Sequence, residues 1–207
     1  MVLWVVGVSV LLVFAMILGL TRMAGNEGSS VVNEKILISE AKLSTESGVV
    51  KVTVVDFSDM QCPACKIAHE MTTDLRNTQG VRFIFRHFPL SGHKYSTISA
   101  KAVEAARQMG KGWEMMDVLF DLQDEWSVVS DKEIESRLVK YATSLGMDET
   151  IFNEKLKSLE TEKSVGIDKS LGNNLKLNGT PTLFINGEQV SPEFVMPKVK
   201  ELLSKQI

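Results

Sequence analysis

Residues Val52–Lys66, VTVVDFSDMQCPACK, contain an apolar run, a short polar turn and two cysteines two residues apart. Val52–Phe57 is nearly continuous in branched and aromatic side chains, which is typical of a central strand covered on both faces. Ser58–Gln61 interrupts this pattern, and Pro63 suits a first helical turn because its missing N–H would have no partner there. The segment therefore predicts a strand, a turn and a helix that begins at the cysteines.

The helix after the cysteines is predicted to extend to about Arg76. Ile67, Met71 and Leu75 recur every four residues and form one apolar stripe, which would face the core. His69 lies on the same helix, one turn past the second cysteine, and we expect it at a solvated position.

Two cysteines at the start of a helix differ in their chemistry. Free N–H groups and the positive end of the helix dipole favour an anion, so the pKa of Cys62 should fall below its free value of about 8.5. Cys62 is then the attacking sulfur. Cys65 lies one turn further in, close enough to form a disulfide with Cys62 or to resolve a mixed disulfide with a substrate.

Two motifs lie far apart in the chain: Phe57–Lys66, FSDMQCPACK, and Gly179–Gly187, GTPTLFING. Together they resemble the thioredoxin superfamily, and more narrowly its DsbA-like thiol:disulfide oxidoreductases, whose exported members often carry FSDxQCPxCK. The resemblance covers roughly Gly48 to the C-terminus. It implies an α/β, thioredoxin-like fold with a central mixed sheet and a helical insertion at about residues 94–177, before the cis-proline loop.

The resemblance also implies roles for individual residues. In the family, the proline that matches Pro181 is cis and lies against the cysteines, and the backbone of the residue that matches Thr180 pairs with an extended substrate peptide. Asp56 matches the buried acid that assists proton transfer from the second cysteine. Pro63–Ala64 would also contact substrate. The best-known oxidases carry Pro-His there, so Ala64 predicts a less oxidising potential.

The composition restricts the classes of function. The chain is 44% hydrophobic and 24% charged with a net charge of −3, which fits one globular domain and is not basic enough to suggest a nucleic acid partner. Its two cysteines leave no second pair for a structural disulfide and too few thiols for a cysteine-rich zinc site. No metal or organic cofactor is expected.

The three histidines are the remaining candidates for chemistry. His87 and His93 flank the end of a second predicted strand, and we expect an exposed or hydrogen-bonded structural role for both. The alternative is a position beside the cysteines, where a histidine stabilises a thiolate. A zinc site that combines the cysteines with His69, His87 or His93 is less favoured, because no zinc-binding spacing is evident.

The first twenty residues suggest a membrane segment. Val2–Leu20 contains no charged residue and would be about 28 Å long as a helix, close to the thickness of a bilayer core. We expect residues 1–21 to form an uncleaved transmembrane anchor, residues 22–34 a flexible tether rich in Gly and Ser, and residues 35–207 the DsbA-like domain. A cleaved signal peptide is the alternative, although no basic region precedes the segment and no clean cleavage site follows it.

The orientation of this anchor has two opposing signals. Arg22 and Lys35, the nearest basic residues, lie on its C-terminal side, which favours a cytosolic domain. DsbA-like proteins are usually exported, which favours the opposite orientation, and we give this argument more weight. We therefore expect a single-pass protein of the cytoplasmic membrane with its catalytic domain on the extracytoplasmic side, or a secreted or periplasmic product if the segment is cleaved.

Four further strands are predicted outside the cysteine segment. Ile36–Ile38 is expected as an edge strand, and Val81–Phe88 as a strand parallel to the first through a right-handed crossover. Thr182–Ile185 and Glu188–Val190 should form a hairpin, because Asn186–Gly187 is the strongest two-residue turn signal.

The rest of the chain is mostly helical by its apolar periodicity. Tyr95–Leu177 is predicted as a series of helices, one of them capped by Asp148. The last helix should begin near Pro197, because this proline would break a helix that began at Ser191–Pro192.

The sequence thus predicts a membrane-tethered thiol:disulfide oxidoreductase that acts on exported polypeptides through Cys62 and Cys65. Oxidase activity is favoured, because the DsbA-like pattern is mostly oxidising and no dimerisation domain, as isomerases carry, fits in the chain. A reductase is the first alternative, since Ala64 and a charged Asp56 would both lower the potential. A non-catalytic peptide-binding or assembly module is the second. The implied partners are polypeptides with thiols or disulfides, a membrane redox partner that recycles the pair, and the bilayer through Val2–Leu20.

Overall fold

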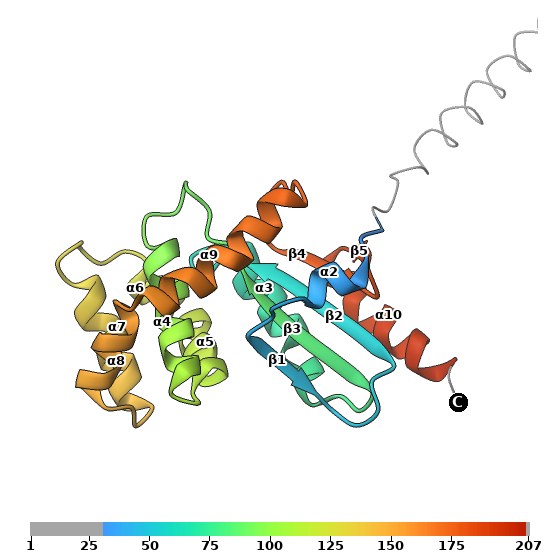
Figure 1. The fold of residues 1–207 in the computed structure, drawn as a ribbon, viewed down its shortest axis with the longest axis horizontal. Helices are drawn as coiled ribbons and strands as arrows, with labels where there is room; N and C mark the ends of the chain where they lie inside the picture. Colours follow the sequence, from blue (N-terminus) through green and yellow to red (C-terminus); the bar gives the residue numbers. More distant parts are fainter. Residues whose placement is uncertain (1–30, 206–207) are drawn as a thin grey trace, which may run out of the picture. The chain divides into compact units, whose positions relative to one another are not determined.

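The computed structural model describes residues 31–205 (Figure 1). The predicted anchor at residues 1–21 and most of the predicted tether lie outside the described residues. Among the helices of the described part, none is both long and apolar enough to cross a membrane.

The centre of the fold is a five-stranded mixed sheet with the order β1-β3-β2-β4-β5. β2 and β3 are parallel, and the other neighbouring pairs are antiparallel. All seven residues of β2 are buried, as its nearly continuous run of branched and aromatic residues predicts for a central strand. The strands are β1 (Leu43–Glu46), β2 (Val52–Ser58), β3 (Val81–His87), β4 (Thr182–Ile185) and β5 (Glu188–Val190).

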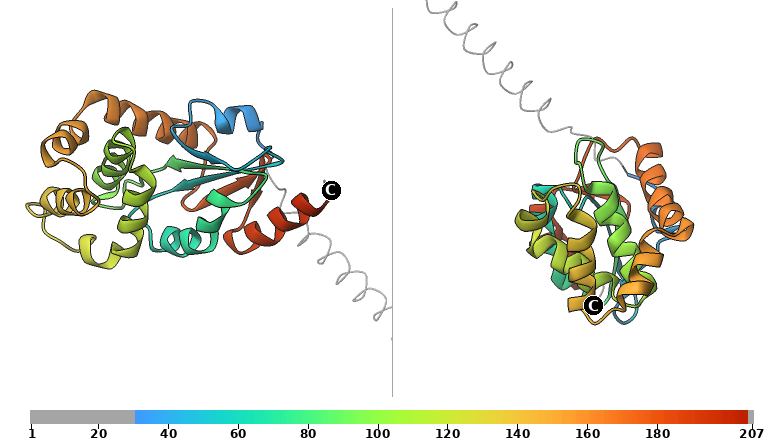
Figure 2. Two further views of the ribbon diagram at one scale, coloured as in Figure 1. Left: turned by 90° about the horizontal axis from the view of Figure 1, so that it is seen from below. Right: turned by 90° about the vertical axis from the view of Figure 1, so that its left-hand side faces the viewer.

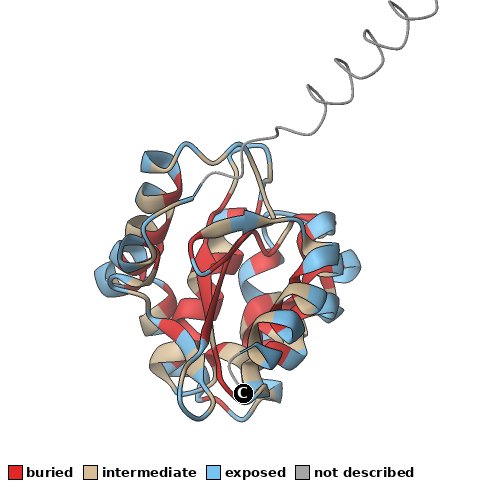
Figure 3. Ribbon diagram, turned by 90° about the vertical axis from the view of Figure 1, so that its right-hand side faces the viewer, coloured by how far each residue is buried: buried red, intermediate tan, exposed pale blue. Residues whose placement is uncertain are grey.

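Helices cover both faces of the sheet (Figure 2). One face carries α3 (Pro63–Thr72), the 3₁₀ helix η1 (Thr73–Asn77) and α10 (Pro192–Ser204); the other carries α2 (Glu34–Ile38) and α9 (Leu159–Asn174). Val54 packs under α10 and η1, whereas its neighbour Val55 packs under α2 and α9. Figure 3 shows the resulting concentration of buried residues along the central strands. A strand covered on both faces has no polar side, which explains the absence of alternation in β2.

A block of helices separates β3 from β4 in the sequence and confirms the predicted insertion. It lies beside the sheet, to the left in Figure 1. Its core surrounds Trp126, which is fully buried and donates its indole N–H to the carbonyl of Leu119 at 2.7 Å. The same core includes Cys62 and Cys65, so the cysteines lie where the block meets the sheet. The helices before α9 are α4 (Ser96–Gln108), α5 (Gly112–Asp121), α6 (Gln123–Trp126), α7 (Ile134–Ser144) and α8 (Glu149–Leu156).

The edge strand predicted at Ile36–Ile38 is wrong, because this segment belongs to α2. The side chain of Asn33 accepts a hydrogen bond from the N–H of Lys35 and caps the helix, while Leu37 is fully buried. The cap and the single buried leucine outweigh the strand preference of isoleucine. The edge strand is β1, which pairs with β3 further along the chain.

Our prediction of which face of α3 is buried is also wrong. Ile67 and Met71 are 56% and 44% exposed. The buried residues are Cys65, Ala68, His69 and Thr72, and the α-helix ends at Thr72, before the predicted end at Arg76. This face consists of small and polar side chains. A search for regularly spaced large apolar residues therefore does not identify it as buried. Leu75 is buried as predicted, but it lies in η1.

His69 is buried rather than solvated, which corrects another prediction. Its Nε2 lies 3.0 Å from Oδ1 of Asp117, and its ring stacks on Phe120 with 4.7 Å between the centroids. Both partners belong to α5 in the helical block. The sequence of α3 gives no indication that His69 is buried, because the residues of α5 that cover it lie about fifty positions further along the chain.

The last helix, α10, begins at Pro192 and contains Pro197, contrary to our prediction. Pro197 removes one N–H, which would have paired with the carbonyl of Glu193. Both residues are exposed, so this loss occurs on the solvent side of the helix, where water can replace the missing donor. Val195 and Val199 hold the other side of the helix in the core.

The hairpin between β4 and β5 meets the start of the described chain. Asn186 and Gly187 have φ values of 49° and 89°, as a type I′ turn requires. The N–H of Val32 donates to the carbonyl of Gly187 at 2.8 Å, and a Cβ added to Gly187 would lie only 2.2 Å from the carbonyl oxygen of Val32. The glycine therefore satisfies both the turn and this close approach.

Gly187→Ala should lower the free energy of unfolding by about 2–4 kcal/mol. A left-handed alanine costs about 1–2 kcal/mol, and the clash with Val32 adds to this cost. Gly110→Ala is the matched control, since its φ is 76° but an added Cβ would meet nothing within 4 Å. Urea unfolding of the two variants measures the difference. Equal losses would show that the contact with Val32 contributes nothing.

Candidate active site

The two cysteines occupy the start of α3. Cys62 is the N-cap residue, with extended φ and ψ of −79° and 120°, and its carbonyl accepts hydrogen bonds from the N–H groups of Cys65 and Lys66 at 3.0 and 3.2 Å. Both thiols are free. Cys62 is 7% exposed and Cys65 is fully buried, whereas Pro63 and Ala64 between them are exposed. A partner molecule would therefore reach Cys62 before Cys65.

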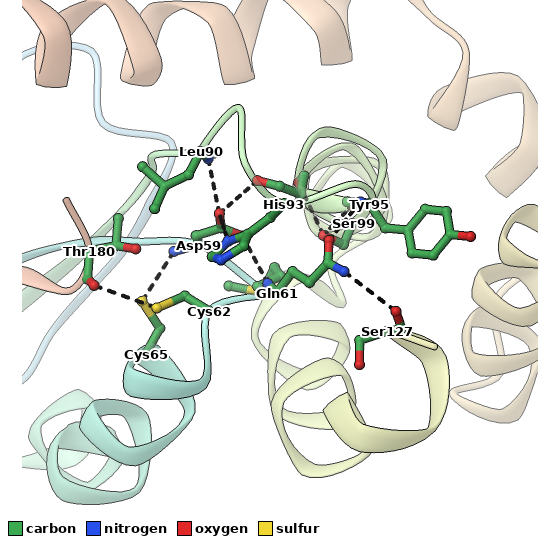
Figure 4. Close-up of polar contacts among 12 residues, drawn as sticks. Asp59, Gln61, Cys62, Cys65, Leu90, His93, Tyr95, Ser99, Ser127 and Thr180 are labelled. Carbon is green, nitrogen blue, oxygen red and sulfur yellow. Dashed lines mark hydrogen bonds and ion pairs between the residues drawn. The ribbon is translucent and has the colours of Figure 1, made fainter. Parts of the chain in front are cut away.

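The cis-proline loop lies against this turn. β4 pairs with β2, and this pairing brings the residues just before β4 next to the start of α3. The peptide bond between Thr180 and Pro181 is cis, as the resemblance implied. The thiol of Cys62 donates to the carbonyl oxygen of Thr180 at 3.5 Å, and Figure 4 shows Thr180 directly facing the two sulfur atoms. Two motifs more than a hundred residues apart thus form one site.

The surroundings separate the pKa values of the two thiols. A hydrogen bond from Cys65 lowers the pKa of Cys62 to about 5 against the opposing effect of burial, and the backbone N–H groups of Cys65 and Ala64 lower it further. Burial raises the pKa of Cys65, and so do its hydrogen bond with Cys62 and the charge of Asp56. At neutral pH, Cys62 is a thiolate and Cys65 is a thiol.

Asp56 is buried beneath the cysteines. Strand alternation places it on the same face of β2 as Val54, which is the face that α3 covers. Burial raises its pKa from 3.8 to about 6, against the hydroxyl of Ser58, which donates to Oδ1 at 2.6 Å, and the charge of His69. The position of this buried acid agrees with the resemblance. Its part in proton transfer stays a prediction.

Asp59 is a functional candidate that the sequence analysis missed. Its backbone N–H donates to Sγ of Cys65 at 3.4 Å, and its side chain is fully buried. Its carboxylate accepts hydrogen bonds from the N–H groups of Gln61 and Leu90 at 2.8 and 2.9 Å and from the hydroxyl of Ser96 at 2.8 Å. Nδ1 of His93 lies 2.8 Å from the same carboxylate. Four partners thus surround one buried carboxyl group on the cysteine loop (Figure 4).

Two glutamines also join the cysteine loop to the helical block, and both were missed. Oε1 of Gln61 accepts a hydrogen bond from the N–H of Tyr95 at 2.6 Å. Gln123, on α6, donates through Nε2 to the carbonyl oxygens of Met60 at 2.8 Å and Cys62 at 3.0 Å. No local signal in the sequence reveals the partners of these two side chains, because the partners lie more than thirty positions away.

The histidines lie apart from the sulfur atoms. Among the described residues, no histidine makes a hydrogen bond to either cysteine. His93 contacts Asp59, and His87 is 2% exposed with no hydrogen-bond partner at either ring nitrogen. Burial lowers the pKa of His87. Within residues 31–205, no group of three or more His, Cys, Asp or Glu side chains is arranged to hold a metal ion.

A family model described as thioredoxin matches residues 49–205, which include both cysteines and the cis-proline loop. The chain belongs to the thioredoxin family. Among its curated relatives, the Na(+)/H(+) antiporter NhaA 3 of Salinispora tropica is 34% identical over 140 residues, which cover 67% of this chain and 20% of the antiporter. This thioredoxin-family chain therefore spans about a fifth of the length of the curated relatives it matches.

Solved structures share the fold of this thioredoxin-family chain. A thioredoxin-like oxidoreductase from Silicibacter pomeroyi has a TM-score of 0.67 at 24% identity, with 84% of this chain and 98% of that one covered. The thiol-disulfide exchange protein α-DsbA2 from Wolbachia pipientis has a TM-score of 0.67 at 22% identity, with coverages of 82% and 91%. These likenesses confirm the predicted DsbA-type thioredoxin fold with its mixed sheet.

Proposed function

We propose that this chain is a thiol:disulfide oxidoreductase that exchanges disulfides with cysteine-containing polypeptides through Cys62 and Cys65. The observation that carries the proposal is the asymmetry of the pair: a slightly exposed Cys62 with a pKa of about 5, and a fully buried Cys65 whose pKa is raised. A low pKa makes Cys62 both a thiolate at neutral pH and a good leaving group. The names of the structural neighbours support the same class of chemistry.

In the oxidising direction, a substrate thiolate attacks Sγ of Cys62 in the Cys62–Cys65 disulfide. The bond between the two sulfur atoms breaks, and Cys65 leaves as a thiolate that takes a proton, for which Asp56 is our candidate donor. A second substrate thiolate then attacks the substrate sulfur of the mixed disulfide, and Cys62 leaves as a thiolate. Two electrons pass from the substrate dithiol to the cysteine pair, and the substrate leaves with a disulfide.

We propose that oxidation is the favoured direction. A low pKa of Cys62 stabilises the reduced protein and so makes the disulfide form a stronger oxidant. The value of about 5 lies between the values of about 3.5 for DsbA and about 7 for thioredoxin. Ala64 occupies the position of the histidine in the best-known oxidases, which agrees with an intermediate value.

Equilibration with glutathione at known ratios, followed by acid quenching and alkylation, measures the potential of the pair. We expect a value between about −120 and −200 mV, which is well above the value of about −270 mV for thioredoxin. A potential near −270 mV would contradict the oxidase and favour the reductase. Failure of the cysteines to exchange with glutathione would favour the non-catalytic peptide-binding or assembly module.

We also propose that the domain works on the extracytoplasmic side of the cytoplasmic membrane, with a membrane redox partner that recycles the cysteines. The uncharged segment Val2–Leu20 and the antiporter name of a relative support a membrane context. The potential tests this proposal as well. Cytosolic glutathione keeps exposed thiols reduced, so an oxidising pair would serve disulfide formation only outside the cytosol.

A further inference from the structure

Gln123 is the first residue of α6 and is 2% exposed. A side-chain amide carries two N–H donors, and both donors of Gln123 are used on the cysteine loop, at the carbonyl oxygens of Met60 and Cys62. Its sequence neighbours belong to the helical block. The contact therefore links the block to the turn that carries the attacking sulfur.

The carbonyl of Cys62 is the pivot of that turn. It accepts the first two hydrogen bonds of α3, from Cys65 and Lys66, and Gln123 adds a third donor. The N–H of Cys62 donates to the carbonyl of Asp59 at 3.0 Å, so the backbone is held on both sides of the sulfur. In this conformation the N–H groups of Ala64 and Cys65 stabilise the thiolate.

The helical block holds Gln123 in a defined place. Trp126, at the other end of α6, is fully buried and is hydrogen-bonded to the carbonyl of Leu119 on α5. The amide of Gln123 is therefore presented by a packed core. A residue on a free loop would adapt to the cysteine loop, whereas this residue imposes a position on it.

We propose that Gln123 is a positioning residue through which the helical insertion holds the Cys62 turn in the conformation that stabilises the thiolate. This inference rests on the proposed function for its biological meaning, because a positioned thiolate matters for disulfide exchange. Without Gln123, the buried carbonyl groups of Met60 and Cys62 each lose a donor, and the turn shifts because the hydrogen bonds that held it against α6 are gone. The other titratable groups around the turn are the same in every variant below: Asp56, Asp59, Cys65 and the Lys66–Asp124 ion pair.

Two substitutions and one matched control test the proposal in the reduced full-length protein. Gln123→Met keeps the length of the side chain and removes both donors, and Gln123→Glu keeps the shape but replaces the donors by a carboxylate. Gln108→Met is the control, because Gln108 donates to Oγ1 of Thr161 at 2.7 Å inside the same helical block. The control removes a comparable hydrogen bond that does not involve the cysteine loop.

The thiolate pKa of Cys62 is measured by its ultraviolet absorbance and by the pH dependence of its alkylation. We expect Gln123→Met to raise this pKa by about one unit. At pH values below the Cys62 pKa, the fraction of Cys62 present as thiolate should then fall about tenfold. Gln123→Glu should raise it at least as much, since a carboxylate next to two carbonyl oxygens repels a nearby thiolate. Gln108→Met should leave the pKa unchanged while it lowers the thermal midpoint.

An unchanged Cys62 pKa in the two Gln123 variants, together with a thermal midpoint as low as that of Gln108→Met, would reduce Gln123 to a structural residue and overturn the proposal. If Gln123→Met fails to fold, Gln123→Leu, which also removes both donors and introduces no charge, decides between the outcomes. The readout does not depend on catalysis. A wild-type protein that exchanges no disulfides would refute the proposed function, yet the pKa comparison would still decide the role of Gln123.

Discussion

Replacing Cys65 by serine should turn the protein into a covalent trap for its substrates. Cys62 can still attack a substrate disulfide with its thiolate, but no second thiol is available to resolve the mixed disulfide. Turnover should fall to the uncatalysed rate, and a one-to-one adduct with a disulfide-containing peptide should accumulate. Non-reducing electrophoresis and intact mass measure the adduct.

The matched variant for this experiment is Cys62→Ser, which should form no adduct. Cys65 is fully buried and its pKa is raised, so it cannot replace Cys62 as the attacking sulfur. Adducts of comparable yield in both variants would contradict the assigned roles. So would continued turnover in Cys65→Ser.

Asp56→Asn should stabilise the reduced protein by about 3 kcal/mol at pH 7–8. Burial raises the pKa of Asp56 from 3.8 to about 6, and each pKa unit corresponds to about 1.4 kcal/mol. The folded state binds the proton more tightly than the unfolded state. The stability that this provides is complete below about pH 3.8 and is lost as the pH rises through about 6. Asparagine keeps an oxygen that can accept the hydrogen bond from Ser58 and removes the buried charge.

The gain from Asp56→Asn should therefore disappear near pH 4, and urea unfolding across this pH range measures it. Asp168→Asn is the contrasting variant, since Asp168 is also an almost fully buried acid but pairs with Arg86 at 2.7 Å. Removal of that partner leaves a buried guanidinium without its counter-charge and should cost about 3–5 kcal/mol at neutral pH. A loss of stability in Asp56→Asn at pH 8 would show that its carboxylate is not held in an unfavourable environment.

The same Asp56→Asn protein also bears on the chemistry. If Asp56 exchanges the proton of Cys65, the steps in which Cys65 leaves or attacks should slow near neutral pH, while alkylation of Cys62 stays fast. Stability and exchange rate would then change in opposite directions in a single variant. This is the combination expected of a buried acid that is retained for its function at a cost in stability.

Local signals in the sequence were enough to predict the central part of the fold. The nearly continuous branched and aromatic run of β2 and the proline after Cys62 act within a few residues, and so does the Asn186–Gly187 turn. The resemblance carried by the two separated motifs predicted the helical insertion and the cis peptide before Pro181. These features depend on residues that are close in sequence or on motifs that can be matched one by one.

Predictions that depended on distant partners were wrong or absent. Residues 36–38 were predicted as a strand, and the buried face of α3 was assigned to Ile67 and Met71. His69 was placed in solvent because α5, which covers it, comes much later in the chain. For His69 and the buried face of α3, a neighbour supplied by the tertiary fold decided the environment, whereas the helix at residues 36–38 also depends on the local cap by Asn33.

The candidate redox pair, and the end of the helix that favours a thiolate, could be predicted from local sequence, because a helix N-terminus exposes its N–H groups wherever the helix lies. The residues that contact the cysteine loop from elsewhere in the chain, in contrast, became visible in the folded structure. Asp59 and Gln123 form hydrogen bonds with groups up to 63 positions away, and a hydrogen bond across such a separation exists only after the chain has folded. The sequence around Asp59 or Gln123 does not indicate which distant residue each will contact.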